Sequence, residues 1–280
     1  MSEFQYYEFR AVDRRLTVKE MAALRRITSR AEITPTRLVN SYSYGSFRGE
    51  PVKLVAKYFD AFLYMTNWGA RTLMVKLPAD CVDRRTAAAL ASDTSAAPAK
   101  GKGHVIVHFE APCDTDMDRW VESTGEVLEE LLPLRDELIA GDTRALYAGW
   151  LAGVMDERVD EGALEPPVPA GLGDPSPALQ ALIDFLFIDP HLFAAAAERS
   201  PKLPARAQRK RAAMEWVTRL SDTRRDTLLA NLLVDGAPQE LAKLRKQFRA
   251  TSTIYRPAAG RRRRANSILA RADVLRSART

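Results

Sequence analysis

The sequence has 280 residues, of which 46% are hydrophobic and 28% charged, a composition typical of a soluble globular protein with one or two domains. It contains no run of about 18 apolar residues and no basic region followed by an apolar stretch at its start. We therefore expect neither a membrane-spanning helix nor a signal peptide. Cys81 and Cys113 are the only cysteines, too few for a disulfide framework, and they favour a reduced, cytoplasmic protein.

Charge is unevenly distributed along the chain. Residues 1–109 hold 17 Lys/Arg against 10 Asp/Glu, residues 110–199 hold 5 against 20, and residues 200–280 hold 20 against 6. The net charge of +6 therefore hides an acidic middle segment and a basic C-terminal segment. Such asymmetry predicts a partner of opposite charge, or contact between the two segments themselves.

The N-terminal third has the patterns of a small mixed sheet with helices. Residues 4–12 alternate as a strand does, so Tyr6 and Tyr7 are expected on opposite faces. Thr17 and Glu20 form a capping box, in which each side chain accepts a hydrogen bond from a free backbone N–H group at a helix start. The other strands are expected over residues 38–44, 72–77 and 104–109.

The stretch from Ser41 to Pro78 carries most of the large aromatic side chains, and its pattern predicts strand, turn, helix, turn, strand. Pro51 suits the first turn of the helix and Gly69 suits its C-terminal stop. We interpret Lys57 and Asp60 as an ordinary surface ion pair three residues apart on that helix. The helix is expected to bury one apolar stripe, formed by Val55, Tyr58, Phe59, Phe62 and Leu63.

After Pro112 the pattern changes to helices, with Pro133 expected to kink or restart the first of them. The predicted fold class is therefore α+β, with a small mixed sheet and helices in the N-terminal part and a mainly α-helical C-terminal part. The predicted division is an α+β domain over 1–111, a helical hairpin over 112–164, a Pro/Gly linker over 165–177, and a helical region with a basic C-terminal helix over 178–280.

Several phrases of the sequence resemble those of uncharacterised bacterial proteins. They are QYYEF (5–9), ITPTR (33–37), YFDAFLY (58–64), NWG (67–69), GDTRALYAGWL (141–151) and EPPVPAGL (165–172). The resemblance covers roughly the first two thirds of the chain. It implies kinship with proteins that have no assigned activity, so it implies no site residue.

The sequence predicts no catalytic, cofactor-binding or metal-binding residue. His104 and His108 lie about 13 Å apart on an extended strand, at about 3.3 Å per residue, which is too far for two ligands of one zinc ion. Asp114, Asp116 and Asp118 resemble the start of a calcium loop, but the Gly and Glu that such a loop needs further on are absent. No phosphate-binding loop or nucleophile motif is present, which favours a non-enzymatic protein.

The basic C-terminal segment is the sharpest functional signal. Arginine clusters grip phosphates through bidentate hydrogen bonds and release condensed counterions. They can equally pair with the acidic segment 110–199 or with an acidic partner. The candidate binding residues are Arg209, Lys210, Arg211, Arg261, Arg262, Arg263, Arg264 and Arg271.

From these features we expect a non-enzymatic protein that binds another macromolecule, most simply a protein. Nucleic-acid binding by the basic C-terminal helices is the first alternative. The second is an enzyme with a candidate pocket in the aromatic stretch, formed by Tyr44, Arg48, Asp60, Tyr64 and Trp68. No cofactor is expected, and the sequence does not determine the oligomeric state.

Overall fold

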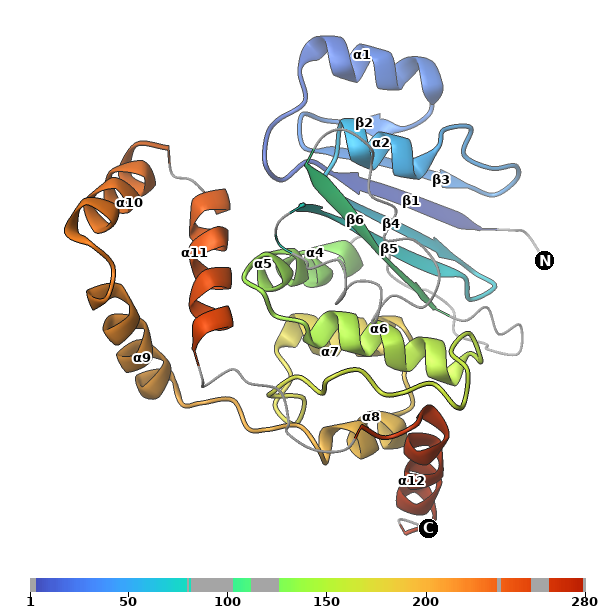
Figure 1. The fold of residues 1–280 in the computed structure, drawn as a ribbon. Helices are drawn as coiled ribbons and strands as arrows, with labels where there is room; N and C mark the ends of the chain where they lie inside the picture. The colour runs from blue at the N-terminus through green and yellow to red at the C-terminus, as the bar shows by residue number, and fades with distance from the viewer. Residues whose placement is uncertain are drawn as a thin grey trace.

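The computed structural model describes residues 4–79, 81, 103–111, 126–235, 238–252 and 262–278. Its architecture is α+β, as the sequence predicts: a six-stranded antiparallel sheet in the N-terminal half is followed by helices (Figure 1). None of the helices in these ranges has the length and apolarity that a bilayer crossing requires.

The sheet has the strand order β2-β3-β1-β4-β5-β6, and every neighbouring pair is antiparallel. The sequence patterns predict four of the six strands and miss β2 and β4. β2 has only two residues, too few for any periodicity. The strands are β1 (Gln5–Arg10), β2 (Glu32–Ile33), β3 (Arg37–Tyr42), β4 (Ala61–Thr66), β5 (Arg71–Pro78) and β6 (His104–Ala111).

The prediction of one long helix between Pro51 and Gly69 is wrong. Helix α2 (Pro51–Lys57) is short, and the chain then forms strand β4. Phe62 of β4 pairs with Phe9 of β1, with ring centroids 4.6 Å apart. The aromatic residues at the end of this stretch satisfy both a helical and an extended period, and cross-strand pairing with β1 favours the strand.

Strand β1 lies inside the sheet and is buried on both faces. Tyr7 and Phe9 face the side covered by α1 (Val18–Ile27) and α2, whereas Tyr6 faces the larger group of helices. The capping box that starts α1 is present, because the Thr17 side chain accepts a hydrogen bond from Glu20 N and the Glu20 carboxylate accepts one from Thr17 N. Alternate side chains of β1 therefore pack into two different cores, one on each side of the sheet.

The second face of the sheet is covered by helices. α4 ends just before Pro133 and α5 begins there, so the proline restarts the helix as predicted. The Pro/Gly-rich segment 165–177 lies against these helices, with Val168 and Leu172 buried in the same core. The helices on this side are α4 (Val127–Leu131), α5 (Pro133–Ile139), α6 (Arg144–Met155) and α7 (Pro177–Phe185). Beyond them, α8 (Pro190–Ala197) packs against α6, and α12 (Ala265–Ser277) packs against α8.

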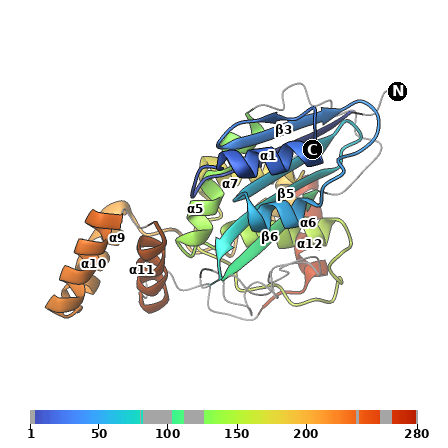
Figure 2. The ribbon, with the colours of Figure 1, turned by 90° about the horizontal axis from the view of Figure 1, so that it is seen from above.

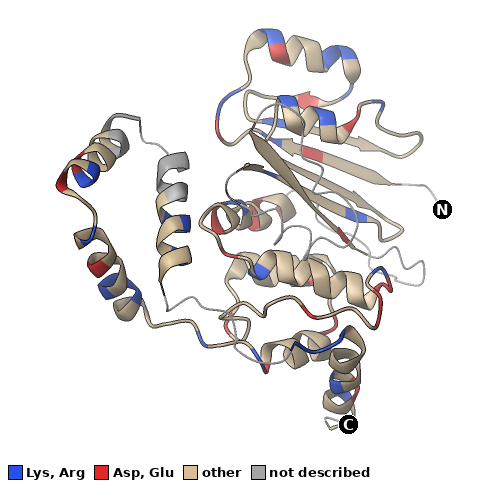
Figure 3. Cartoon of the chain, in the orientation of Figure 1, with Lys and Arg blue, Asp and Glu red and all other residues tan. Residues whose placement is uncertain are grey.

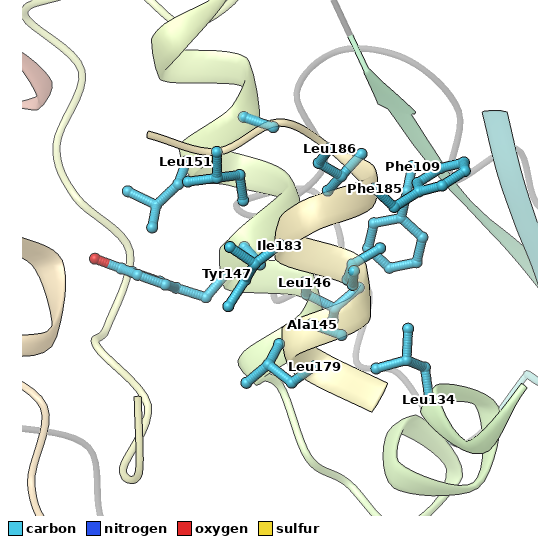
Figure 4. Close-up of a cluster of buried hydrophobic side chains, with 14 of the residues drawn as sticks. Phe109, Leu134, Ala145, Leu146, Tyr147, Leu151, Leu179, Ile183, Phe185 and Leu186 are labelled. Atoms are coloured by element: carbon cyan, nitrogen blue, oxygen red, sulfur yellow. The ribbon is translucent and has the colours of Figure 1, made fainter. Parts of the chain in front are cut away.

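Leucine and isoleucine side chains of α6 and α7 fill the centre of this core (Figure 4). Tyr147 of α6 is fully buried beside them, and its hydroxyl points away from the aliphatic side chains of Leu146 and Ile183. A buried hydroxyl needs a hydrogen-bond partner, and that partner comes from outside the aliphatic cluster.

Three further helices project from this body: α9 (Arg206–Thr218), α10 (Asp222–Asp235) and α11 (Pro238–Thr251). We call them the arm. Figures 1 and 2 both show the arm extending away from the sheet, with α11 returning toward the body, where it packs against α5. Gly141, in the turn after α5, has φ +78°, and a Cβ there would lie 3.5 Å from Arg249 Cδ of α11. Glycine allows the left-handed backbone conformation of this turn, which lies where the arm touches the body.

Candidate functional site

The C-terminal arginine run folds back onto the acidic middle segment. Arg263 donates to the Glu165 carboxylate through Nε and Nη2, at 2.8 and 2.6 Å, and through Nη1 to the Ala195 carbonyl. Tyr147 donates its hydroxyl to the same carboxylate at 2.6 Å. Burial and the nearby Glu165 charge raise the pKa of Tyr147, so its hydroxyl remains a neutral donor. Glu165 is 2% exposed, and these contacts neutralise its buried charge.

The neighbouring arginines are held in the same way. Arg262 donates to the backbone carbonyls of Leu164 and Glu165, and Arg264 donates to that of Gly162. On α12, Arg271 forms an ion pair with Glu198 at 2.6 Å. Each of these guanidinium groups therefore has an intramolecular acceptor, which is the second of the two uses that the sequence left open. Arg261 lies outside the described residues.

The arm carries a second group of cations with a different environment. Its helices span residues 206–251, which hold 11 Lys/Arg against 5 Asp/Glu. Arg211 pairs with Glu215 of its own helix at 3.8 Å. Figure 3 shows Lys and Arg on all three helices of the arm. Within the described ranges, no hydrogen-bonded or ion-paired side-chain partner is found for Arg209, Lys210, Arg219, Arg245 and Lys246.

The arm has no core of its own among the side chains that the structure describes: none in α9, α10 or α11 is buried. Four large apolar side chains are exposed there instead, Met214, Val217, Leu229 and Leu233. A folded segment that buries little and carries many unpaired charges is typical of a binding element rather than of a scaffold.

A groove of about 650 Å³ lies between the arm and the body. Arg209 Nε is buried and lacks a hydrogen-bond partner in the part of the chain that the structure describes. Because this Nε atom is buried, it does not open onto the groove itself, although the Arg209 side chain contributes to the lining. The charged and aromatic lining comes from three helices: Asp136 and Glu137 of α5, Arg209 and Lys210 of α9, and Arg245 and Phe248 of α11.

Two contacts hold residues that line this groove, Arg249 and Phe248. Arg249 of α11 lies 3.5 Å from the buried Asp142 carboxylate, which also accepts from Arg144. Within the arm, the rings of Phe248 and Trp216 are 5.9 Å apart at 62°, so α9 and α11 meet through an edge-to-face aromatic pair. Of the lining residues, Arg249 is thus tied to the body by an ion pair, and Phe248 packs on an aromatic neighbour inside the arm.

The candidate pocket in the aromatic stretch is spread over the sheet. Tyr44 is 80% exposed in the loop after β3, Arg48 is exposed further along that loop, and Trp68 is half-buried in the turn between β4 and β5. Tyr64 packs against Tyr7, with centroids 4.8 Å apart. Asp60 precedes β4, about four strand residues or ~13 Å from Tyr64. The structure therefore brings Tyr64 to β1 and leaves Asp60 at the other end of the strand.

Asp60 lies in a buried polar cluster that the sequence patterns miss. Its carboxylate pairs with Lys76 at 2.9 Å and accepts from the N–H groups of Val12 and Asp13. The predicted surface pair with Lys57 is therefore wrong, because the helix ends at Lys57 and the side chain of Asp60 turns inward. Burial alone would raise the Asp60 pKa, but the two N–H groups and the Lys76 ammonium lower it below its usual value.

A similar cluster surrounds Glu8 on the opposite face of the sheet. The Glu8 carboxylate, fully buried, accepts from the Tyr6 hydroxyl and from Arg10 Nε, both at 2.8 Å, and lies 3.0 Å from Arg37 Nε. Burial, and then the hydrogen bond to Glu8, raise the pKa of Tyr6 to about 12. The alternating pattern of β1 places Glu8 on this face, but only the pairing with β3 supplies Arg37.

The histidine pair lies on β6 as expected, and within the described ranges no group of three or more His, Cys, Asp or Glu side chains is arranged to hold a metal ion. Cys113 and the aspartates Asp114, Asp116 and Asp118 lie outside those ranges. Comparison with known protein families, with curated proteins and with solved structures finds no match to this chain.

Proposed function

We propose that this protein is a non-enzymatic, cytoplasmic nucleic-acid-binding protein and that the arm is its binding element. The observation that carries the proposal is the contrast between two groups of basic residues, one at the C-terminus and one on the arm. In the C-terminal group, Arg263 and Arg271 form ion pairs and Arg262 and Arg264 donate to backbone carbonyls. By contrast, Arg209, Lys210, Arg219 and Arg245 of the arm have no hydrogen-bonded or ion-paired side-chain partner among the described residues. Unpaired cations on an exposed surface are the electrostatic requirement for phosphate binding.

The composition of the arm supports this proposal over binding at the C-terminus. Its helices are basic, with 11 Lys/Arg against 5 Asp/Glu, and they extend away from the sheet, with only α11 packed against the body (Figure 2). An aromatic residue, Phe248, lies in the same groove as Arg209 and Lys210. Basic grooves that contain aromatic side chains are the usual means of holding nucleic acid without a catalytic site.

The test compares charge reversal on the arm with the same reversal elsewhere. The arm variant carries Lys210→Glu, Arg219→Glu and Arg245→Glu, and the control carries Lys19→Glu, Arg26→Glu and Arg30→Glu on and beside α1. All six side chains are exposed, so both variants should keep the fold and both change the net charge by the same amount. Affinity for a labelled single-stranded 12-mer and for a duplex of equal length is measured by fluorescence anisotropy at low salt.

The arm variant should lose more than about tenfold in affinity, because the contacts that release counterions are removed. The control should lose much less, since only the long-range field of the protein changes. Equal losses in the two variants would mean that net charge alone attracts the probe. Absence of binding by the unmodified protein would overturn the proposal.

A protein partner is the second candidate, favoured by the exposed apolar side chains of the arm. Leu229 and Leu233 are 61% and 79% exposed and lie one turn apart on α10. A second copy of this chain has matching chemistry, since its own Leu229 and Leu233 offer the same apolar surface. Sedimentation should then show a concentration-dependent dimer that Leu229→Asp with Leu233→Asp disrupts. A monomer at every concentration would exclude this arrangement.

A further inference from the structure

We infer that the groove between α5, α9 and α11 holds one nucleotide of a single strand, with the phosphate on the arm and the edge of the base on α5. This inference rests on the proposed function and adds two things to it: the strandedness of the nucleic acid and the bases that it favours.

The side of the groove formed by the arm has the chemistry of a phosphate site. Lys210 and Arg245 are exposed cations that line the groove, and the half-buried Arg209 side chain adds a third positive charge to the same lining. A phosphate in the groove would place its negative charge between these cations and accept hydrogen bonds from them. The volume of about 650 Å³ lies within the range of sites that enclose a small ligand.

Phe248 supplies a surface for the base. Its side chain is half-buried, lines the groove and is held by the edge-to-face contact with Trp216. Nucleic-acid bases stack on aromatic rings regardless of their identity, provided that the base is not already stacked in a duplex. A single strand can present such a base, whereas a continuous duplex cannot.

The side formed by α5 is acidic, which a site for phosphate alone would not require. Asp136 and Glu137 would weaken the binding of a polyanion unless they accept hydrogen bonds from it. The exocyclic amino group of cytosine is a donor that Asp and Glu accept, whereas thymine presents a carbonyl oxygen at the same position. The two carboxylates therefore select a base edge that carries an amino group.

Binding of oligo(dC) and oligo(dT) of equal length tests this inference with the full-length protein. The unmodified protein should bind oligo(dC) about tenfold more tightly than oligo(dT), the size of one good side-chain contact to a base edge. Asp136→Asn with Glu137→Gln should bring the two affinities within about twofold of each other, while both rise because two negative charges are removed. The matched control, Glu126→Gln with Glu130→Gln on the neighbouring helix, should keep the tenfold ratio.

A charge effect alone predicts a different result, because it raises the affinity for both oligonucleotides and leaves their ratio unchanged. Equal binding of oligo(dC) and oligo(dT) by the unmodified protein, or a ratio that survives in the α5 variant, would overturn the inference and leave the proposed function standing. Failure to bind either oligonucleotide or a duplex would overturn both the inference and the proposed function.

Phe248→Leu tests the stacking role, because it keeps an apolar side chain against Trp216 but removes the aromatic ring. It should lower the affinity for both oligonucleotides alike. Unchanged affinity in that variant would contradict the stacking role.

Discussion

Arg263 and Glu165 form a bidentate ion pair in the helical half of the molecule, with Nε–Oε2 and Nη2–Oε1 distances of 2.8 and 2.6 Å, although 98 residues separate them in the chain. The pair joins the loop before α12 to the acidic segment beside α6, and the Tyr147 hydroxyl completes it. This contact holds Arg263 inside the molecule, whereas Arg262 and Arg264 on either side of it are exposed. It also shows that the basic C-terminal segment and the acidic middle segment contact each other in the fold.

Replacing Arg263 should therefore lower the stability of the folded protein. Arg263→Ala leaves the buried Glu165 carboxylate without its cation, and we expect a loss of about 3–5 kcal/mol in the free energy of unfolding. Arg263→Lys should lose less unfolding free energy, because lysine keeps the positive charge. Some loss should remain, because lysine cannot form the bidentate hydrogen bonds. Urea unfolding measures both. Arg271→Ala, at the exposed pair with Glu198, is the control and should cost clearly less. A similar cost at the two sites would mean that Glu165 is solvated.

Phe62→Ala tests the aromatic core on the other side of the sheet. Phe62 is 2% exposed and packs against Phe9, so truncation should cost about 3–5 kcal/mol in unfolding free energy. Tyr44→Ala, at a side chain that is 80% exposed, should stay within about 0.5 kcal/mol. A loss below about 1 kcal/mol at Phe62 would contradict its place in the core.

The difference between predicted and observed structure in this stretch has a physical origin. Alternation in residues 4–12 identifies β1 because its two faces differ in residue type, and Pro133 marks a helix start through its fixed φ. By contrast, Phe62 and its apolar neighbours fit both periods, and only the register with β1 decides between them.

Ion-pair partners that lie far apart in the sequence cannot be identified from sequence patterns for a related reason. Charge counts predict that the basic and acidic segments can meet, but they do not identify Glu165 as the partner of Arg263. The pair between Asp60 and Lys76 likewise depends on where α2 ends and how β5 lies in the sheet. The groove needs three helices in place before Arg209 and Glu137 can line it together.

The pH dependence of stability should contain a contribution from Asp60. Its pKa is lowered in the folded protein, so its stabilisation is fully present above the unfolded pKa of about 3.9 and is lost as the pH falls through the folded pKa. Asp60→Asn should therefore destabilise the protein most at neutral pH, with a difference from the unmodified protein that shrinks below about pH 4. Unfolding in urea between pH 2 and 7 measures this difference, and a constant difference would show that Asp60 is not ionised in the folded state.

Gly141→Ala tests the turn at the base of the arm. Alanine at φ +78° should cost about 1–2 kcal/mol, and the added Cβ would make only an ordinary contact with Arg249 Cδ at 3.5 Å. Gly173→Ala is the matched control, because no atom lies within 4 Å of its Cβ and its φ is not positive. It should leave the unfolding free energy unchanged or slightly raised. Equal effects at the two glycines would contradict the strained turn.

The salt dependence of binding to a single-stranded oligonucleotide tests the role of the arm most directly. The logarithm of the association constant should fall linearly with the logarithm of salt concentration, with about 0.7 of slope for each phosphate contacted. Replacing Lys210, Arg219 and Arg245 by alanine should reduce the slope by about 2, whereas Arg271→Ala, whose guanidinium is paired with Glu198, should leave it unchanged. A slope that is insensitive to the arm substitutions, or that falls equally with Arg271→Ala, would contradict the assignment of the arm as the nucleic-acid-binding element.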